Sequence, residues 1–194
     1  MGDPSDQGDD DERPRHEVYV SEFFLEKRPV TWSLWQRVCS WAAQHGYELD
    51  EGAGKEDEHP VQSVSWFDAV KWCNARSEME GLRPCYYEDA EYQRVYRSGD
   101  SDLANNCVDW QAEGYRLATE AEWEKAARGG LDGHHFPWES PGDRAYTELI
   151  TNEQANYNNT KGGTSPVGEY AANGYGLYDM SGNVYEWCWD VCKE

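Results

Sequence analysis

The sequence has few basic residues and no long apolar run. It holds 17 lysines and arginines against 38 aspartates and glutamates, a formal net charge of −21 at pH 7. A nucleic-acid-binding protein needs positive charge to neutralise phosphates, and an anionic membrane surface repels an acidic chain. A signal peptide and a bilayer-spanning apolar stretch are also absent from the sequence. We therefore expect neither nucleic acid nor a membrane as partner, and a cytoplasmic location if Met1 is the true start.

Several catalytic and metal-binding patterns are missing as well. No pair among the six cysteines has the Cys-x-x-Cys spacing of a zinc knuckle, and the five histidines include no His-x-x-x-His. No serine lies in a Gly-x-Ser-x-Gly setting, and no glycine-rich loop suits a phosphate. Zinc chemistry, acyl transfer and nucleotide binding are therefore not indicated.

The first four cysteines fit structural positions. Cys39 and Cys73 fall on the apolar faces of expected helices, so we predict buried thiols that act as small hydrophobes. Cys85 and Cys107 flank a long polar loop. Either a disulfide or two free thiols is compatible with that placement.

The last two cysteines lie close to the end of the chain. Cys188 and Cys192 are four residues apart in a tryptophan-rich segment, which suggests redox or soft-metal chemistry. Their only adjacent basic group is Lys193, so little would stabilise a thiolate. A structural interpretation is the stronger of the two.

Aromatic residues are abundant: they make up 14% of the chain and include ten tryptophans. A core made of a few large amphipathic side chains is typical of a loop-rich protein and not of a helical bundle. The 194 residues predict a single domain over 1–194. The acidic run at about 1–12 is expected to be a flexible, solvated tail.

Three helices are predicted from capping patterns followed by apolar residues at helical period. Each pattern pairs a hydroxyl side chain with a polar residue three positions later, and glycine ends each helix. The caps are Ser33 with Gln36, Ser65 with Asp68, and Thr119 with Glu122; the stops are Gly46, Gly81 and Gly129. The expected buried stripe of the second helix is Ala69, Val70, Trp72, Cys73 and Ala75.

Short strands are predicted at 16–24, 60–64 and 115–117, and near Tyr86 and Val108, from β-forming residues between turn signals. Beyond residue 131 the sequence alternates glycine, asparagine, proline and aromatics, which is typical of packed loops. The predicted fold class is therefore α+β, with two to three helices, short strands and long loops.

The strongest candidate for a site lies near the end of the chain. Asp179 and Glu186 are hard oxygen donors, and Gly182 and Asn183 between them permit a tight turn. Such a turn would aim the carbonyls of Gly182 and Val184 inward beside the two carboxylates. This set suits calcium. Hydrogen bonding of the carboxylates to loop amides is the other interpretation, and the spacing leaves both open.

Several sequence blocks occur together in a recognisable order. Val-Ser-Trp-Phe-Asp-Ala-Val lies at 64–70, and Gly-Tyr-Arg-Leu-Ala-Thr-Glu-Ala-Glu-Trp-Glu-Lys-Ala-Ala-Arg-Gly-Gly at 114–130. Phe-Pro-Trp at 136–138, Ala-Asn-Tyr at 155–157 and Ser-Pro-Val-Gly at 165–168 follow. The run at 174–187 is Gly-Tyr-Gly-Leu-Tyr-Asp-Met-Ser-Gly-Asn-Val-Tyr-Glu-Trp. This order resembles the sulfatase-modifying factor, or formylglycine-generating enzyme, family over nearly the whole chain.

The resemblance implies a mixed α+β fold related to C-type lectins, with little regular secondary structure and with structural calcium. One implied calcium site has the ligands Asp179, Gly182, Val184 and Glu186, and a second begins at Asn156 and Tyr157. The loop 158–164 that follows supplies no acidic residue to complete the second site.

The activity that the resemblance implies is copper-dependent oxidation of a sulfatase cysteine to formylglycine. The family's copper-binding cysteine pair follows an Arg-Gly-Gly-Ser motif, which this sequence lacks, and Cys188 and Cys192 do not match it. We therefore expect a domain truncated at its C-terminus, and slightly at its N-terminus, with no catalytic residue and no activity of its own. The expected partner is a sulfatase or another protein substrate. The alternatives are a non-catalytic, lectin-like binding module and a gene fragment without function.

Overall fold

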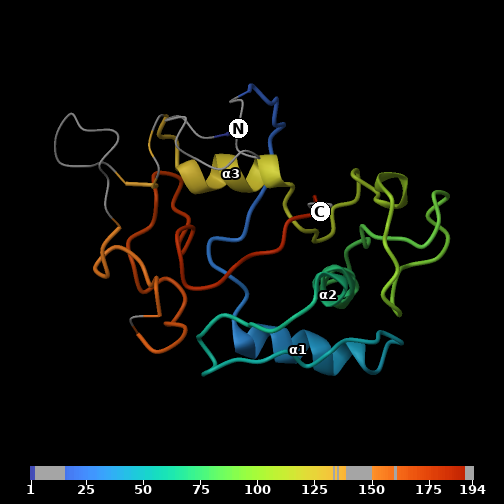
Figure 1. Ribbon diagram of the computed structural model, residues 1–194. Coiled ribbons are helices and arrows are strands. Elements are labelled where there is room, and N and C mark those ends of the chain that lie inside the picture. Colours follow the sequence, from blue (N-terminus) through green and yellow to red (C-terminus); the bar gives the residue numbers. More distant parts are fainter. Residues whose placement is uncertain (3–15, 133, 135, 139–149, 160, 191–194) are drawn as a thin grey trace. The chain divides into compact units, whose positions relative to one another are not determined.

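The structure is a computed structural model that describes residues 1–2, 16–132, 134, 136–138, 150–159 and 161–190 (Figure 1). Most of the predicted acidic tail lies outside these residues. The chain divides into two compact units, Val30–Leu117 and the combination of Met1–Pro29 with Ala118–Glu194. Each unit is described by itself. The single domain over 1–194 stays a prediction, because this division concerns compactness and not independent folding.

The first helix of the unit Val30–Leu117 is α1, Trp32–Ala42. Its cap is Thr31, whose Oγ1 accepts a hydrogen bond from the Leu34 N–H at 3.2 Å. The prediction that Ser33 caps this helix is therefore wrong. Ser33 already lies within the first turn, and its hydroxyl contacts the Thr31 hydroxyl at 3.2 Å. Two hydroxyl residues stand close together here, and the earlier one has the extended backbone that a cap requires.

The second helix, α2, spans Trp66–Met79 and confirms its prediction. The Ser65 Oγ accepts a hydrogen bond from the Asp68 N–H at 3.0 Å. Gly81 follows the helix with a φ of 76°, a left-handed conformation that glycine adopts without strain. The predicted buried stripe is also confirmed: Ala69, Val70, Trp72, Cys73 and Ala75.

Two tryptophans join α1 to α2. In Figure 1, α2 is seen end-on and α1 runs across the view beside it. Trp35 and Trp72 stack with ring centroids 5.3 Å apart and an interplanar angle of 3°. The Trp72 indole N–H also donates to the Trp35 carbonyl at 3.3 Å. Packing of large aromatics thus takes the place of an aliphatic core, as the composition predicted.

Strand pairing in the described residues is limited to isolated bridges. They are Thr31 with Pro60, Ala53 with Gln62, Tyr86 with Val108, and Tyr87 with Val95. The segments predicted as strands near Tyr86 and Val108 do pair with each other, but over a single bridge. The α+β prediction is confirmed, with less strand than expected.

A buried asparagine supplies hydrogen bonds that a sheet would otherwise provide. Asn74 on α2 is fully buried, and its Nδ2 donates to the carbonyls of Tyr86 at 2.8 Å and Tyr96 at 3.1 Å. Its Oδ1 accepts from the Cys85 N–H at 3.1 Å and the Tyr86 N–H at 3.0 Å. One carboxamide therefore satisfies four buried backbone groups in two segments.

The segment 115–117 is not a strand, contrary to prediction. Its amides bond to hydroxyl groups instead: the Tyr115 N–H donates to Ser77 Oγ at 2.7 Å, and the Leu117 N–H to the Tyr86 hydroxyl at 2.8 Å. A short 3-10 helix, η2, spans Asn105–Cys107.

In the other unit, α3 spans Glu120–Arg128 and has the complete capping box that the sequence predicted. The Glu122 N–H donates to Thr119 Oγ1 at 3.2 Å, and the Thr119 N–H donates to the Glu122 carboxylate at 2.8 Å. Gly129 ends the helix in the left-handed conformation. An apolar cluster is formed by Ala126 of this helix with Leu177 and Met180. Partly buried residues pack against it: Phe23, Leu25, Trp123 and Ala127.

The predicted strand at 16–24 is absent. Within the described residues no segment forms a ladder with it, so its β-forming residues remain without a sheet. The alternation expected of a strand survives in its last part, because Phe23 and Leu25 pack against the cluster while Phe24 is 99% exposed. The local pattern was correct, but a strand also needs a partner.

A second buried asparagine joins α3 to the C-terminal run. The Asn173 Nδ2 donates to the Ala126 carbonyl at 2.7 Å, and its Oδ1 accepts from the N–H groups of Tyr175 and Leu177 at 3.0 and 3.2 Å. A Cβ at Gly129 would lie 2.9 Å from the Asn173 Cβ. Glycine is therefore required here both for its φ and for the close approach.

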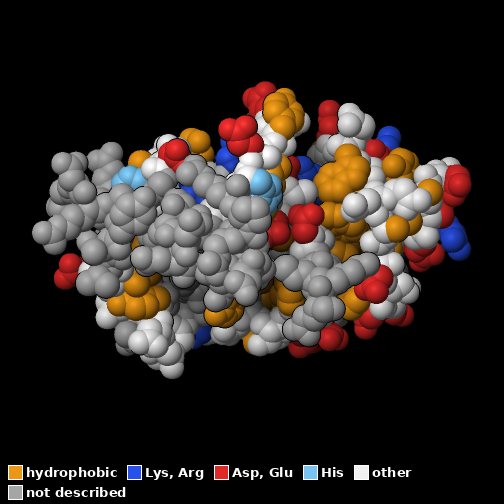
Figure 2. All heavy atoms as spheres, turned by 45° about the horizontal axis from the view of Figure 1, so that its top comes forward, with side chains coloured by type: hydrophobic (Ala, Val, Ile, Leu, Met, Phe, Trp, Pro, Cys, Tyr) orange, Lys and Arg blue, Asp and Glu red, His pale blue; other side chains and the backbone are white. Residues whose placement is uncertain are grey.

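No helix in the described ranges is long and apolar enough to cross a membrane. On the face shown in Figure 2, acidic side chains are spread among apolar ones and basic side chains are few. This agrees with the net charge of −21.

We predict that Asn74→Ala lowers the free energy of unfolding by on the order of 3 kcal/mol, because it leaves buried backbone groups without partners. Urea denaturation followed by tryptophan fluorescence measures the change. Asn106→Ala is the matched control, since Asn106 is exposed and its side chain accepts a weak 3.8 Å bond from the Cys107 thiol. Equal stabilities of the two variants would contradict the role given to Asn74.

Candidate functional site

Asp179 lies at a bend of the C-terminal run. Its φ is 57°, and its Oδ2 accepts a hydrogen bond from the Gly168 N–H at 2.6 Å. Burial raises the pKa of Asp179, although the Gly168 bond and the positive charge of Arg28 oppose the shift. The carboxylate is thus partly desolvated, with one oxygen committed to the backbone.

Glu186 is held by α3. Its Oε2 accepts a hydrogen bond from the Trp123 indole N–H at 2.6 Å. Glu186 is exposed as a residue. Partial desolvation of its carboxyl group raises the pKa of Glu186, the Trp123 bond opposes the shift, and the negative charge of Asp179 adds to it. The structure therefore brings the two predicted carboxylates within electrostatic reach of each other.

A tight turn separates the two carboxylates, as the sequence predicted. Gly182 has a φ of 111° and Asn183 of 67°. The Val184 N–H donates to the Gly182 carbonyl at 2.9 Å, which closes the turn. A Cβ at Gly182 would lie 2.5 Å from the Asn156 carbonyl oxygen, so only glycine fits.

The oxygen atoms of this turn fit a hard cation. Among the described residues nothing donates a hydrogen bond to Asp179 Oδ1, Glu186 Oε1 or the Val184 carbonyl. No group of three or more His, Cys, Asp and Glu side chains in these ranges is placed to hold a metal ion. Two carboxylates and nearby carbonyls belong to the ligand class that calcium prefers, and the calcium site at this turn stays a prediction.

The residues of the second implied site lie against the same turn. The Asn156 carbonyl accepts from the Asn183 N–H at 2.8 Å, and the Asn156 Nδ2 donates to the Gly163 carbonyl at 2.9 Å. The Tyr157 hydroxyl donates to the Ile150 carbonyl at 2.9 Å. Asn156 is thus fixed as a donor through its nitrogen, and its Oδ1 accepts no hydrogen bond from the described residues.

Sequence reasoning missed the residues that support the site from a distance. Asn183 exchanges two hydrogen bonds with the backbone of Ser165, at 2.9 and 3.1 Å. Trp123 and Gly168 hold the two carboxylates. These contacts join positions 11 to 63 residues apart, and no local spacing encodes them. Their only sequence signal was membership of the blocks at 114–130 and 165–168.

The cysteines divide into buried and more accessible thiols. Cys85 and Cys107 are free thiols, so the structure favours that alternative over a disulfide. Cys73 is buried as predicted, whereas Cys39 is only half-buried. Burial raises the pKa of Cys73 to about 12 and those of Cys39 and Cys85 to about 11. These three thiols are therefore protonated at neutral pH.

No described cysteine belongs to a group of three or more His, Cys, Asp and Glu side chains that could hold a metal ion. Cys188 is half-buried and forms no disulfide with another described cysteine. Cys192, its predicted companion, lies outside the described residues.

The sequence and the fold are similar to known proteins. The family model described as "Sulfatase-modifying factor enzyme 1-like domain" matches residues 1–194. The chain is 37% identical over 191 residues to the chaperone protein LppX of Paenibacillus barcinonensis, covering 89% of the chain and 64% of the relative. It is 31% identical to the formylglycine-generating enzyme of Streptomyces coelicolor, covering 98% and 65%. The inactive C-alpha-formylglycine-generating enzyme 2 of Bos taurus is also 31% identical, with 96% and 66% covered.

Solved structures resemble the chain as well. CarF matches with a TM-score of 0.68 and 31% identity, over 86% of the chain and 69% of CarF. PvdO from Pseudomonas aeruginosa matches with a TM-score of 0.66 and 26% identity, over 98% and 66%. The chain spans slightly less than two thirds of the length of each of the three sequence relatives above.

We predict that Gly182→Ala destabilises the protein more than Gly176→Ala does. Both glycines have a positive φ, but a Cβ at Gly176 meets no atom within 4 Å. Gly176→Ala should therefore cost about 1 kcal/mol from backbone strain alone, and Gly182→Ala about 1–3 kcal/mol more from its clash with the Asn156 carbonyl. Thermal unfolding followed by circular dichroism compares the two. A smaller loss for Gly182→Ala would show that the turn is not packed against Asn156.

Proposed function

This chain belongs to the family of sulfatase-modifying factor enzyme 1-like domains, and from that premise we propose that its 194 residues form a calcium-stabilised domain that binds a cysteine-containing protein segment. Its fold is the α+β fold of that family, with little regular secondary structure. The observation that carries the proposal is the pairing of Asp179 with Glu186 around a glycine turn.

Calcium at this turn would be held by the free carboxylate oxygens of Asp179 and Glu186 and by the carbonyls of Gly182 and Val184. Both carboxyl groups have a raised pKa, so each is costly to ionise in its present surroundings. A bound divalent cation would offset the free-energy cost of ionising the two carboxyl groups, because it stabilises their charged forms. Calcium would thereby tie the C-terminal run to α3 through Trp123.

A second calcium, at Asn156 and the Tyr157 carbonyl, is the lesser part of this proposal. It is supported by Asn156 Oδ1, which accepts no hydrogen bond from the described residues although the side chain is buried. The neighbouring loop 158–164 contributes no carboxylate, so any ion there would depend on neutral oxygens and bind more weakly.

The proposed partner is a sulfatase or another protein that presents a cysteine. The relatives named as formylglycine-generating enzymes support this partner class. Exposed aromatics beside the site also support it, since Tyr185 and Trp187 flank Glu186 and expose their rings to solvent. Aromatic residues of this kind are enriched in protein interfaces.

Oxidation of the bound cysteine requires copper in this family, and in the described residues no cysteine belongs to a group that could hold a metal ion. We therefore assign no chemical step to these 194 residues. A non-catalytic, lectin-like binding module is the second candidate, and it is favoured by the Bos taurus relative, which is named inactive and is as similar as the Streptomyces coelicolor enzyme.

Calcium should raise the thermal midpoint of the chain relative to EDTA. At a free concentration of about 100 times Kd, the added stability is about 2.7 kcal/mol. Isothermal titration calorimetry should show the binding in the same samples. Asp179→Asn and Glu186→Gln should abolish the calcium effect, whereas Glu153→Gln, which changes an exposed carboxylate of the same unit, should preserve it. Calcium binding that survives both site variants would place the ion elsewhere.

The chain, supplied with copper, oxygen and a cysteine-containing peptide, should retain the peptide without converting its cysteine. An aldehyde-reactive probe detects formylglycine, and a fluorescent peptide reports binding by anisotropy. The formylglycine-generating enzyme of Streptomyces coelicolor serves as the active control. Aldehyde formation by the 194-residue chain would overturn the non-catalytic assignment, and absence of peptide binding would overturn the proposed partner class.

A further inference from the structure

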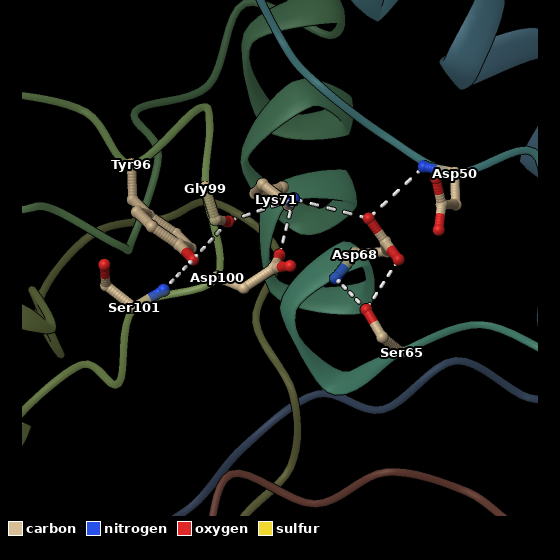
Figure 3. Close-up of polar contacts among 8 residues, drawn as sticks. All are labelled: Asp50, Ser65, Asp68, Lys71, Tyr96, Gly99, Asp100 and Ser101. Atoms are coloured by element: carbon tan, nitrogen blue, oxygen red, sulfur yellow. Dashed lines mark hydrogen bonds and ion pairs between the residues drawn. The ribbon is translucent and has the colours of Figure 1, made fainter.

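A lysine is buried in the unit Val30–Leu117, away from the residues discussed above (Figure 3). Lys71 lies on α2, and its side chain is only 4% exposed. Its ammonium nitrogen lies 3.4 Å from Asp68 Oδ1, 3.2 Å from the Gly99 carbonyl and 3.5 Å from Asp100 Oδ1. Three oxygens thus surround one ammonium group, which has three N–H donors to offer.

The carboxylate of Asp68, which lies on α2 like Lys71, is also held by contacts that do not involve Lys71. Asp68 Oδ2 accepts from the Ser65 hydroxyl at 2.5 Å, and Asp68 Oδ1 accepts from the Asp50 N–H at 3.3 Å. Asp68 is itself buried at the first turn of α2. Its position is therefore set by the helix cap and by the neighbouring loop, and it does not depend on the lysine.

The other two oxygens around Lys71, the Gly99 carbonyl and Asp100 Oδ1, belong to the segment 97–101, which we call the clasp loop. The Gly99 carbonyl accepts from the Tyr96 hydroxyl at 2.8 Å as well as from Lys71, and the Tyr96 hydroxyl accepts from the Ser101 N–H at 3.1 Å. Gly99 has a φ of 77°, which only glycine adopts readily. The clasp loop is thus shaped so that a backbone oxygen and a carboxylate oxygen reach the same ammonium.

The charge of this cluster also favours a cation. Two carboxylates face one ammonium, so the cluster with Lys71 in place carries a net charge of −1. Asp100 is 70% exposed and is readily solvated, whereas Asp68 is buried and depends on Lys71 for compensation. A buried carboxylate that loses such a charged partner is strongly destabilised.

We propose that these oxygens form a binding site for a primary ammonium group, that Lys71 of the same chain fills it, and that this internal cation holds the clasp loop closed on α2. The residues from Ser98 to Asp102 are exposed, so little apolar packing secures the loop. Arg97 anchors the start of the loop, because its guanidinium donates to the His45 carbonyl and to Glu78 at 2.7 Å each. Lys71 and the Tyr96 hydroxyl hold the exposed remainder, Ser98 to Ser101. Removal of the ammonium opens the loop and leaves a vacant site of the right size and charge for a small amine.

The test uses Lys71→Ala in the full chain, with hydrogen–deuterium exchange of the segment 97–101 as readout. Exchange in this segment should accelerate about tenfold or more, because opening of the loop no longer breaks an ion pair. The turn at 89–94 should keep its exchange rate, since Asp89 bonds to the Gln93 and Arg94 N–H groups without Lys71. Methylammonium should then restore slow exchange in a saturable manner.

Tetramethylammonium is the matched ligand control, because it carries the same charge without an N–H donor. Lys55→Ala is the matched protein control, since Lys55 is exposed in the same unit. Equal rescue by both ammonium ions would reduce the effect to charge screening and overturn the proposal. Unchanged exchange in Lys71→Ala would overturn it as well.

Two further variants keep the proposal testable if Lys71→Ala does not fold. Lys71→Met retains the buried hydrocarbon chain and should show the same local acceleration. Asp100→Asn changes an exposed residue and leaves α2 intact, and it should accelerate exchange of the clasp loop by a smaller factor. Exchange equal to wild type in both variants would show that the loop does not depend on the ammonium.

Discussion

Buried backbone groups in this chain need hydrogen-bond partners, and in the described residues isolated bridges supply few of them. Backbone bonds within turns supply many of the rest, and asparagine side chains add bonds between segments that lie far apart in the sequence. Asn74 joins α2 to two loop segments, Asn173 joins the end of α3 to the C-terminal run, and Asn183 joins the carboxylate turn to Ser165. A carboxamide offers donors and an acceptor in one rigid group, so it can replace part of a ladder where the chain does not run straight. The order of the loops therefore depends on a few buried amides.

Hydrogen bonds from an asparagine side chain also shape the candidate site. The turn between Asp179 and Glu186 is shaped by Asn183, which bonds to Ser165, and by Gly182, which lies against the Asn156 carbonyl. The two carboxylates are in turn fixed by Gly168 and Trp123. The oxygens of the turn are thus positioned before any ion binds. Preorganisation of this kind lowers the cost of ordering a calcium loop.

The comparison of sequence with structure shows which features are local. Ser65 and Thr119 were predicted correctly as caps, because a cap and its partner lie three residues apart. The same rule failed at Ser33, where Thr31 offered an equivalent hydroxyl two positions earlier. Spacing and family resemblance together suggested one site for Asp179 and Glu186, and that site stays a prediction. The roles of Trp123 and Asn74 were not predictable, since they depend on contacts between distant segments.

The predicted strand at 16–24 shows that pairing between segments cannot be predicted from a local pattern. Its alternation of inward and outward residues is visible in Phe23, Phe24 and Leu25, yet no ladder forms with the described residues. Strand propensity describes a surface that fits a sheet, and the sheet itself is a property of two segments. A single sequence read locally therefore predicts helices and turns better than pairing.

Two pairs of carboxylates in this chain differ in how their negative charge is compensated. Asp68 and Asp100 share the ammonium of Lys71, which the chain itself provides. For Asp179 and Glu186 the described residues form no ion pair, and the pKa of each carboxyl group is raised by burial. An internal lysine compensates the charge of Asp68 without any solute. Two carboxylates that form no ion pair among the described residues gain stability from any cation that binds the folded state, and that gain is the physical reason for proposing calcium at the C-terminal run.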